Sequence, residues 1–373
     1  MFCNKLILEK IYRNMKNKMT TLCYIEKDGK YLMLHRVSKK NDINKDKWIG
    51  VGGHFEEDES PEECLLREVR EETGLRLTSW KFKGLITFCS EIYPTEYMCL
   101  FTADSFTGEI KECREGRLEW VEKDKIPALN LWDGDLLFLD LMQREVPFFS
   151  LKLCYDSENR LKSAALDGRE MELFDLCDEK GRPTGHVMER SMVHRLGMLH
   201  RTVHIWVVQK NPDGSIEVLL QKRCESKDSY PGCYDISSAG HIHAGDDFES
   251  SAIRELEEEL GIRANPHDLR FIGIHEGSIE AAFYGEDFKD HEISAVYLYE
   301  KPVDLEELTL QKSEVDSVMF MKYEQIHQGM KEKSLPSCIY PKELEMIQAS
   351  MQNDFCPEEV WVKELLGKVD NEW

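Results

Sequence analysis

The sequence lacks three features that would assign it to a specialised class of protein: paired cysteines, long apolar runs and an excess of positive charge. Its twelve cysteines occur singly, and no two are spaced as Cys-x-x-Cys. That spacing is typical of zinc knuckles and redox-active dithiols, so the sequence favours neither. In a chain of 373 residues, isolated cysteines favour reduced thiols in a cytosolic protein. We therefore predict a cytoplasmic location.

Long apolar runs are also missing. The apolar stretch near the N-terminus, LILEKIYRNMK, is interrupted by charge almost at once, which is not the pattern of a signal peptide. No run approaches the length of a transmembrane helix. We therefore expect no membrane partner.

Positive charge is scarce: 48 Lys and Arg stand against 71 Asp and Glu, giving a formal net charge of −23. Binding to nucleic acid needs a positive surface, so we expect no nucleic-acid polymer as a partner. A small phosphorylated substrate remains compatible with this charge if a divalent cation lies between the two negative partners. With 41% hydrophobic residues, the chain can bury two ordinary cores.

What the sequence does contain is a long internal repeat. MTTLCYIEKDGKYLMLHR predicts two strands joined by a KDGK turn, and TVHIWVVQKNPDGSIEVLLQKR predicts the same arrangement with NPDG as the turn. The segments that follow are also similar: the first copy has GGHFEEDESPEECLLREVREETGL and the second has AGHIHAGDDFESSAIRELEEELGI. The shared pattern begins near Gly53 and again near Gly240, so the repeat unit spans roughly half of the chain. A repeat unit of this length indicates a duplicated domain rather than a solenoid.

Composition divides the chain further. The stretch SENRLKSAALDGRE is polar and carries a DG turn signal, which favours a domain boundary. PKELEMIQASMQN and PEEVWVKELLGKV predict terminal helices. The predicted segments are an N-terminal extension (1–18), a first domain (19–160), a linker (161–170), a second domain (171–345) and a C-terminal helical tail (346–373).

Both copies follow one frame: Gly, five residues, an acid, seven residues, then Arg-Glu-apolar-x-Glu-Glu-x-Gly-apolar. In the first copy the defining positions are Gly53, Glu59, Arg67, Glu68, Val69, Glu71, Glu72, Gly74 and Leu75. In the second copy they are Gly240, Asp246, Arg254, Glu255, Leu256, Glu258, Glu259, Gly261 and Ile262. The frame predicts a loop and a helix that ends at a glycine with positive φ.

The glutamates of this helix should repel one another. Glu68, Glu71 and Glu72 share one helix face, where like charges cost roughly 0.2–0.5 kcal/mol per pair. A solvated acidic face is the ordinary explanation, but it would not require Arg and Gly at fixed offsets or recur in the second half of the chain. Oxygen clusters suit Mg²⁺ or Mn²⁺, which also bind substrate phosphates. We therefore predict that a divalent cation relieves the repulsion and brings the substrate.

This frame resembles the Nudix box, the motif of hydrolases that cleave a nucleoside diphosphate linked to another moiety. Every defining position matches, with Asp246 in place of the first glutamate. The resemblance covers about residues 19–160 and 171–345. It implies an α+β fold of two tandem Nudix α/β/α sandwiches, each with a mixed β-sheet between helices.

The resemblance also implies roles for the box residues. The implied metal ligands are Gly53 (through its carbonyl), Glu68, Glu71 and Glu72 in the first copy, and Gly240, Glu255, Glu258 and Glu259 in the second. Arg67 and Arg254 would orient the neighbouring glutamates by charge-assisted hydrogen bonds and complete the implied catalytic set. The metal then supplies a hydroxide that attacks phosphorus.

The general base stays open between a box glutamate and an acid from a later loop. The candidates outside the boxes are Glu96, Glu115 and Glu314. For each of these three, an ordinary surface carboxylate is the alternative interpretation.

The first copy is similar to the MutT-like branch, the 8-oxo-dGTP diphosphatases, in KWIGVGGHFEEDES and LEWVEKDKIPALNLWDGD. The resemblance implies that Trp132 and Asp135 hold an oxidised purine. The alternative is a core tryptophan and a helix-capping aspartate. Ile49 follows Trp48 where eukaryotic relatives carry an asparagine that reads the base, so specificity for oxidised guanine stays open.

The second copy resembles the isopentenyl-diphosphate-isomerase-like Nudix proteins in HRTVHIWVV and KDSYPGCYDISSAGHIHAGD. True isomerases build a metal site from histidines and acids near a catalytic cysteine. The matching residues are His194, His200, His241, Asp290 and Glu292. The isomerase cysteine aligns with Ala239, and Cys233 lies six residues earlier. Without that thiol, the complete glutamate cluster favours diphosphate hydrolysis.

The leading hypothesis is a divalent-metal-dependent hydrolase acting on a small-molecule nucleoside diphosphate or other diphosphate. Its first domain would be a nucleoside triphosphate pyrophosphohydrolase that releases a nucleoside monophosphate and pyrophosphate. One alternative is an isomerase acting on prenyl diphosphates through the second domain. Another is a sensory module that binds nucleotide without cleaving it, although such modules often show eroded glutamates and a DNA-binding segment.

Overall fold

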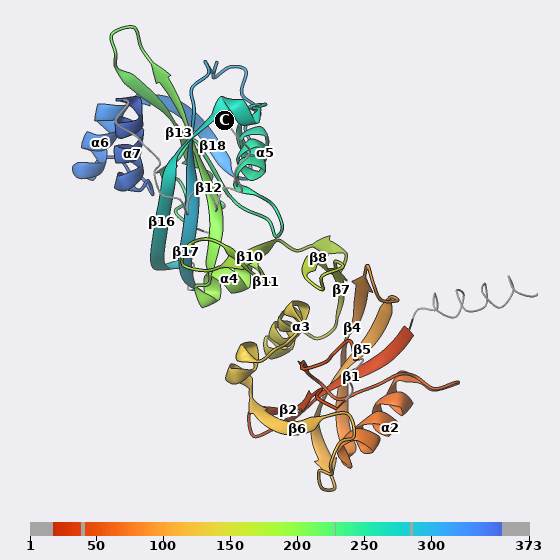
Figure 1. The fold of residues 1–373 in the computed structure, drawn as a ribbon. Helices are drawn as coiled ribbons and strands as arrows, with labels where there is room; N and C mark the ends of the chain where they lie inside the picture. Colours follow the sequence, from red (N-terminus) through yellow and green to blue (C-terminus); the bar gives the residue numbers. More distant parts are fainter. Residues whose placement is uncertain (1–17, 39–41, 228, 284–285, 353–373) are drawn as a thin grey trace, which may run out of the picture. The chain divides into compact units, whose positions relative to one another are not determined.

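The computed structural model describes residues 18–38, 42–227, 229–283 and 286–352. It divides the chain into two compact units with a boundary after Leu173, although the segment His186–Met188 belongs to the first (Figure 1). Nearly all of the predicted N-terminal extension and most of the predicted C-terminal tail lie outside the described residues. Among the described helices, none combines the length and the apolar composition needed to cross a membrane.

The first unit is built on a nine-stranded mixed sheet. From edge to edge its strands are β3 (Trp48–Ile49), β2 (Lys30–His35), β1 (Lys18–Lys27), β5 (Glu96–Thr107), β4 (Arg76–Ser90), β7 (Phe149–Tyr155), β8 (Leu161–Leu166) and β9 (Arg169–Glu170), and β6 (Arg117–Glu122) also pairs with β2. The pairs β1–β5 and β4–β7 are parallel, and the others are antiparallel. The helices are α2 (Pro61–Thr73), η1 (Lys123–Ala128, 3₁₀) and α3 (Asp133–Gln143).

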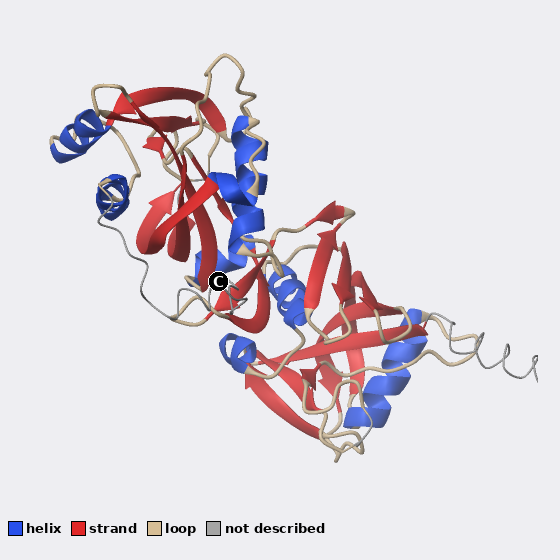
Figure 2. Cartoon of the chain, turned by 45° about the horizontal axis from the view of Figure 1, so that its top comes forward, coloured by secondary structure: helices blue, strands red, loops and turns tan. Residues whose placement is uncertain are grey.

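Alternation along β1 places one helix on each face of this sheet. Cys23 and Ile25 belong to the buried cluster that contains Leu65 of α2. The intervening Tyr24 points to the opposite face, where its ring centre lies 6.0 Å from that of Phe138 in α3. Successive side chains of a strand point to opposite faces, so α2 and α3 cover the two sides. Figure 2 shows helices flanking the strands in both units.

The second unit repeats this plan with a seven-stranded mixed sheet. Its strands, in order, are β14 (Tyr234–Asp235), β13 (Ile216–Arg223), β12 (Leu199–Lys210), β17 (Glu286–Tyr299) and β16 (Leu269–Phe283), while β15 (Ser238–His241) pairs with β12 and β18 (Val315–Lys322) pairs with β13. The central pair, β12 and β17, is again parallel. The helices are α4 (Arg190–Leu196), α5 (Phe248–Leu260), η2 (Pro266–Asp268, 3₁₀), α6 (Tyr323–Lys331) and α7 (Pro341–Met351), and a separate two-stranded sheet pairs β10 (Leu173–Cys177) with β11 (Pro183–Glu189).

Alternation along β12 explains the layers of the second unit. Ile205 and Val207 are buried in one cluster with Leu256 of α5. Trp206, between them, is buried in a second cluster with Ile347 of α7. Figure 1 accordingly shows α5 on one side of the strands and α6 and α7 on the other. The predicted α+β fold of two sandwiches, each with a mixed sheet between helices, is confirmed.

The box helix ends where its sequence predicts, and a capping box marks its start. Ser60 and Glu63 form a capping box, in which the Ser60 hydroxyl accepts the N–H of Glu63 and the Glu63 carboxylate accepts the N–H of Ser60. The helices α2 and α5 end at Gly74 and Gly261, whose φ values are +81° and +74°. Only glycine adopts this left-handed conformation without strain, so both predicted glycine stops are confirmed.

Two predicted boundaries are wrong. Residues 161–170 form β8 and β9 instead of a linker, and their DG signal is the turn of this hairpin, with φ values of +51° at Asp167 and +78° at Gly168. Leu161 and Ala164 are buried, so the polar composition reflects only the exposed alternate positions. Similarly, residue 346 lies inside α7, where Ile347 is fully buried in the second unit.

Replacing Leu256 with alanine should lower the free energy of unfolding of the second unit by about 2–5 kcal/mol, because it empties a closed part of the core. Leu305, which is 40% exposed, is the matched control, and Leu305→Ala should change the stability by less than about 0.5 kcal/mol. Denaturant unfolding followed by circular dichroism measures both. Equal effects would contradict the described packing.

Candidate functional site

In the first unit the box brings backbone and carboxylate into direct contact. A Cβ atom at Gly53 would collide with the carboxylate of Glu68, so only glycine allows the loop to lie this close to α2. The N–H of the preceding Gly52 donates to Glu72 at 3.1 Å. Both glutamates therefore lie beside the loop that carries the predicted carbonyl ligand.

Arg67 holds the loop and the helix together. Its guanidinium donates to both oxygens of Glu59, at 2.6 and 2.8 Å, and to Glu68 at 2.6 Å. It also donates to the carbonyl of His54 at 2.9 Å. This fork of charge-assisted bonds fixes the orientation of Glu68, as the motif predicts.

Glu72 lies in a strongly negative environment. It is only 7% exposed, and burial raises its pKa to about 8, with Glu115 and Glu68 adding to the rise and Arg36 opposing it. Buried carboxylates with so little compensating positive charge fit a divalent cation, which binds oxygen ligands. Glu68, Glu72 and the Gly53 carbonyl are the groups placed to hold it.

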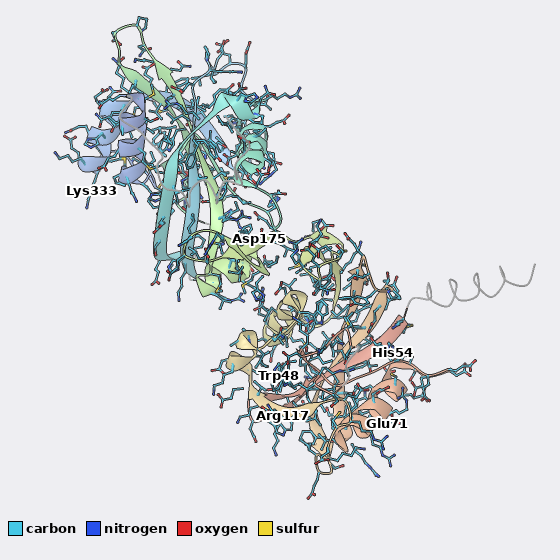
Figure 3. All side chains as sticks on the ribbon, in the orientation of Figure 1. Trp48, His54, Glu71, Arg117, Asp175 and Lys333 are labelled. Atoms are coloured by element: carbon cyan, nitrogen blue, oxygen red, sulfur yellow. The ribbon has the colours of Figure 1, made fainter. Side chains whose placement is uncertain are left out.

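Glu71 is placed differently from its two neighbours. Its side chain is 64% exposed and its carboxylate lies 3.7 Å from Arg67; Figure 3 labels it at α2. Of the described residues that line the central cavity, Glu68 and Glu72 come from the helix. A role for Glu71 as a metal ligand therefore remains a prediction.

One cavity of about 370 Å³ connects the acidic groups with an aromatic wall. Its acidic lining comes from Glu68, Glu72, Glu96 and Glu115. Ile49, Phe88, Trp132, Asp135 and Tyr155 also line it, and Phe88 is the cross-strand partner of Glu96. The predicted purine residues and the predicted metal ligands thus line the same space.

The aromatic wall is rigid. Trp132 meets Phe88 and Tyr155 edge to face, with ring centres 5.7 and 5.2 Å apart. The ammonium group of Lys47 lies 5.3 Å from the centre of the Trp132 ring. Asp135 is 8% exposed, and burial raises its pKa to about 7. The carboxyl group can therefore act as an acceptor or a donor near neutral pH.

The second unit reproduces the contacts of the first box. A Cβ at Gly240 would collide with the carboxylate of Glu255, and the N–H of Ala239 donates to Glu259 at 3.1 Å. Burial raises the pKa of Glu255 to about 8 and that of Glu259 to about 7. The same donor set therefore fits a divalent cation here. Glu258, like Glu71, is largely exposed.

Asp246 stands where the first unit has Glu59, and the hydrogen bonds of Arg254 differ accordingly from those of Arg67. Arg254 donates to the His241 carbonyl at 3.0 Å and pairs with Glu255 at 2.8 Å, as its counterpart does in the first unit. However, its Nε atom is buried with no partner among the described residues. In the first unit the longer Glu59 accepts that bond, so the shorter acid leaves one donor unmatched.

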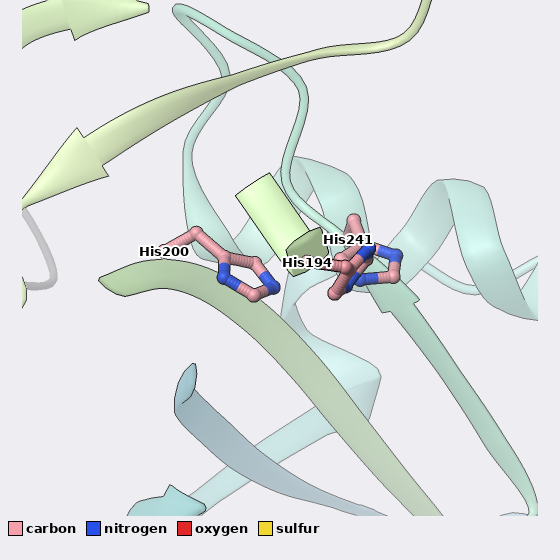
Figure 4. A group of neighbouring side chains, drawn as sticks. All are labelled: His194, His200 and His241. Carbon is pink, nitrogen blue, oxygen red and sulfur yellow. The ribbon is translucent and has the colours of Figure 1, made fainter. Parts of the chain in front are cut away.

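The predicted histidines do come together (Figure 4). Ligand atoms of His194, His200 and His241 lie within 4.8 Å of one another, as do those of His200, Asp290 and Glu292. The Nδ1 of His200 lies 3.0 Å from the Met198 carbonyl, so this nitrogen carries the proton and the Nε2 lone pair is free to bind.

Several atoms of this histidine cluster are unsatisfied. The Nε2 atoms of His194 and His200 and Oδ1 of Asp290 are buried without a hydrogen bond among the described residues. Burial lowers the pKa of His194 to about 3 and that of His241 well below its usual value. Neutral imidazoles are the form that binds a metal, so the donor set fits a transition-metal ion.

The other predicted acids are engaged with partners. Glu115 pairs with Arg36, and Glu96 accepts the hydroxyl of Thr20 at 2.8 Å. Glu314 pairs with Lys227. Glu96 and Glu115 line the cavity of the first unit.

The sequence did not predict a polar network behind the histidine cluster. Glu343 of α7 is fully buried and accepts hydrogen bonds from His204 Nδ1 (2.7 Å) and Trp206 Nε1 (2.8 Å). His204 Nε2 lies 3.6 Å from Glu292. The carboxylates raise the pKa of His204 to about 9 against the effect of its burial, while burial raises that of Glu292 to about 8, so His204 lies between two acids with which it can share a proton.

Arg36 and Asn44 were also missed. Arg36 ends the segment LMLHR, and its counterpart Arg223 ends LLQKR, so an alignment of the two copies contained a signal for the arginine. Asn44 had no such signal, because its importance depends on a contact with Trp132, distant in sequence.

The comparisons agree with this geometry. A family model described as the NUDIX domain matches residues 16–142 and 198–339. The chain is 44% identical over 156 residues to Nudix hydrolase 3 of Arabidopsis thaliana, a match that covers 41% of this chain but only 20% of that protein. It is 34% identical over 134 residues to the oxidized purine nucleoside triphosphate hydrolase of Danio rerio, covering 35% of this chain and 83% of the relative. The crystal structure of a MutT protein from Bacillus halodurans is 26% identical and covers 40% of this chain and 97% of its own, with a TM-score of 0.37.

In each of the two regions matched by the family model, a loop glycine packs against a glutamate of the box helix. This contact and the family match together define the class of protein. The chain belongs to the NUDIX family of hydrolases, with two such domains in one polypeptide. Members of this family typically use divalent metal ions, in keeping with the two carboxylate clusters.

Asp135→Asn should reduce the pH dependence of stability. The folded chain holds the Asp135 proton up to about pH 7, whereas the ordinary pKa is 3.8. Protons bound in excess by the folded state make stability fall as pH rises between these values, by up to about 1.4 kcal/mol per unit of pKa difference. The variant, which lacks this loss, should therefore gain stability relative to wild type between pH 4 and 8.

Denaturant midpoints measured across this pH range test the expectation, with Asp124→Asn, on the exposed side of η1, as the control for removing a charge. A constant difference between Asp135→Asn and wild type would show that Asp135 ionises normally.

Proposed function

We propose that the first unit hydrolyses a purine nucleoside triphosphate, preferring an oxidised purine, and releases a nucleoside monophosphate and pyrophosphate. The observation that carries this proposal is the single cavity that joins Glu68 and Glu72 to Trp132 and Asp135. The name of the Danio rerio relative supports the same substrate class. The partner is a small molecule, and the free thiols of the described cysteines support a cytoplasmic location.

The residues of the cavity have different roles in the proposed hydrolysis. Mg²⁺ or Mn²⁺ held by Glu68, Glu72 and the Gly53 carbonyl would supply an activated water and neutralise the charge of the phosphates. Arg67 keeps Glu68 oriented. The base stacks against Trp132 while the Asp135 carboxyl meets its edge.

Two carboxylates outside the box are placed to take the proton released by the attacking water. Glu96 and Glu115 line the same cavity as the box glutamates. The Glu115 carboxylate is already engaged by Arg36. Among the described residues, Glu96 accepts a hydrogen bond from the neutral hydroxyl of Thr20, so we favour Glu96 as the base.

For the second unit we propose metal-dependent hydrolysis of a diphosphate whose other moiety is not a stacked purine. Glu255, Glu259 and the Gly240 carbonyl would hold the ion. The histidine cluster would hold a second, transition-metal ion, because its ligand atoms converge and the buried Nε2 atoms of His194 and His200 make no hydrogen bond among the described residues, with Asp290 Oδ1 3.8 and 3.5 Å away. Isomerase chemistry is disfavoured because Ala239 replaces the required thiol.

Glu68→Gln and Glu255→Gln should each lower metal-dependent turnover of the substrate of its own unit by at least about 100-fold, because a neutral amide binds a hard cation poorly. Steady-state assays of nucleoside monophosphate and pyrophosphate release measure the loss in Glu68→Gln. Phosphate and pyrophosphate release from a panel of nucleotides and prenyl diphosphates measures it in Glu255→Gln, with Mg²⁺ varied in both. The exposed Glu62→Gln on α2 is the matched control. Undiminished Mg²⁺-dependent turnover in the double variant would refute the metal assignment.

His200→Ala should remove one tightly bound transition-metal ion per chain, because two ligand sets share His200. Metal analysis of the purified protein by mass spectrometry measures the content. His267→Ala, on the exposed side of η2, should leave it unchanged. Equal metal content in both variants and wild type would exclude the histidine site.

A further inference from the structure

We propose that Asn44 reads the base in the first unit and selects a 6-oxopurine, the guanine type, over a 6-aminopurine, the adenine type. Asn44 lies in the loop between β2 and β3 and lines the cavity together with Trp132 and Asp135. The inference rests on the proposed function of this unit, since it names the residue that sets the identity of the base.

The orientation of the Asn44 amide follows from its partner. The indole Nε1–H of Trp132 donates to Asn44 Oδ1 at 2.8 Å. An indole nitrogen can only donate, so the amide oxygen must face it. The amide nitrogen therefore keeps its two N–H donors, which have no protein partner among the described contacts. A ligand stacked on Trp132 meets these donors beside the ring.

The loop holds Asn44 in place. The backbone N–H of Asn44 donates to Asp42 Oδ1 at 3.0 Å. The other oxygen of Asp42 accepts from two nitrogens of Arg36, at 2.8 and 2.7 Å. Arg36 pairs in turn with Glu115, which also lines the cavity. The donor is thus fixed before a ligand arrives, and little conformational entropy is lost on binding.

The chemistry of the donor decides the preference. A 6-oxopurine offers a carbonyl oxygen at the base edge, which can accept from the Asn44 amide. A 6-aminopurine presents its own N–H groups there, so donors would face donors and one would stay unpaired. Ile49 on the same cavity is apolar and cannot substitute for this contact. Asn44 carries the side-chain amide among the residues that line this cavity, and we assign the contact with the base edge to it.

The isosteric change Asn44→Asp tests the inference. Aspartate still accepts from the Trp132 indole, but it replaces the free donors with an acceptor. We expect the ratio of kcat/KM for 8-oxo-dGTP over 8-oxo-dATP, and for dGTP over dATP, to fall by about tenfold or more. Asn44→Leu, of similar size, should lose discrimination without reversing it, and it keeps the test open if the aspartate variant folds poorly.

The experiments use the full chain carrying Glu255→Gln, so that the second unit does not contribute. Asn211→Asp is the matched control, because it makes the same exchange in a loop of the second unit, where the amide donates to the Ser215 hydroxyl. It should leave the ratio unchanged. Thermal unfolding confirms that each variant is folded.

The outcomes separate the two proposals. A parent chain that hydrolyses these triphosphates, with ratios that neither Asn44 variant alters, would overturn the role of Asn44 and leave the proposed function standing. A parent chain that hydrolyses none of them would overturn both. A fall in the ratio for Asn44→Asp alone, without a change in the control, is the supporting result.

Discussion

Both units depend on one constraint, which is the burial of negatively charged carboxylates next to the backbone of a glycine. Glu72 and Glu259 lie almost out of water, each beside another acid of its helix, and the glycine of each box leaves no room for a side chain. Such carboxylates cost free energy unless positive charge compensates them. The chain supplies one amide donor and one nearby arginine in the first unit, which is too little. The fold therefore favours a divalent cation at this position.

The first unit connects this charged region to the base region through a single arginine. Arg36 pairs with Glu115 on one side and with Asp42 on the other, and Asp42 holds the loop that carries Asn44. Glu115 and the loop that carries Asn44 are therefore both held in place before the substrate binds. Preorganisation of this kind lowers the entropic part of a reaction barrier, because the groups are already placed when the substrate binds.

Local rules explain what the sequence predicted well. Glycine stops marked the ends of the two box helices, and the KDGK and NPDG turn signals marked the antiparallel strand pairs β1–β2 and β12–β13. Predictions based on composition were weaker: the polar residues at 161–170 belong to an exposed hairpin, because alternation leaves half of an edge strand in water. The sequence could not predict the roles of Asn44 and Glu343, since each role depends on a partner more than eighty residues away in sequence.

The two units keep the same carboxylates but differ in the surface opposite them. In the first, Trp132, Phe88 and Tyr155 form an aromatic wall that suits the flat face of a base. In the second, His204 lies between Glu292 and Glu343, with the rings of His275 and Tyr340 beside it. Buried polar groups of this kind need hydrogen-bonding partners, which the flat face of a base does not supply. We infer that the duplicated carboxylates conserve the reaction, whereas the opposite walls direct the units to different substrates.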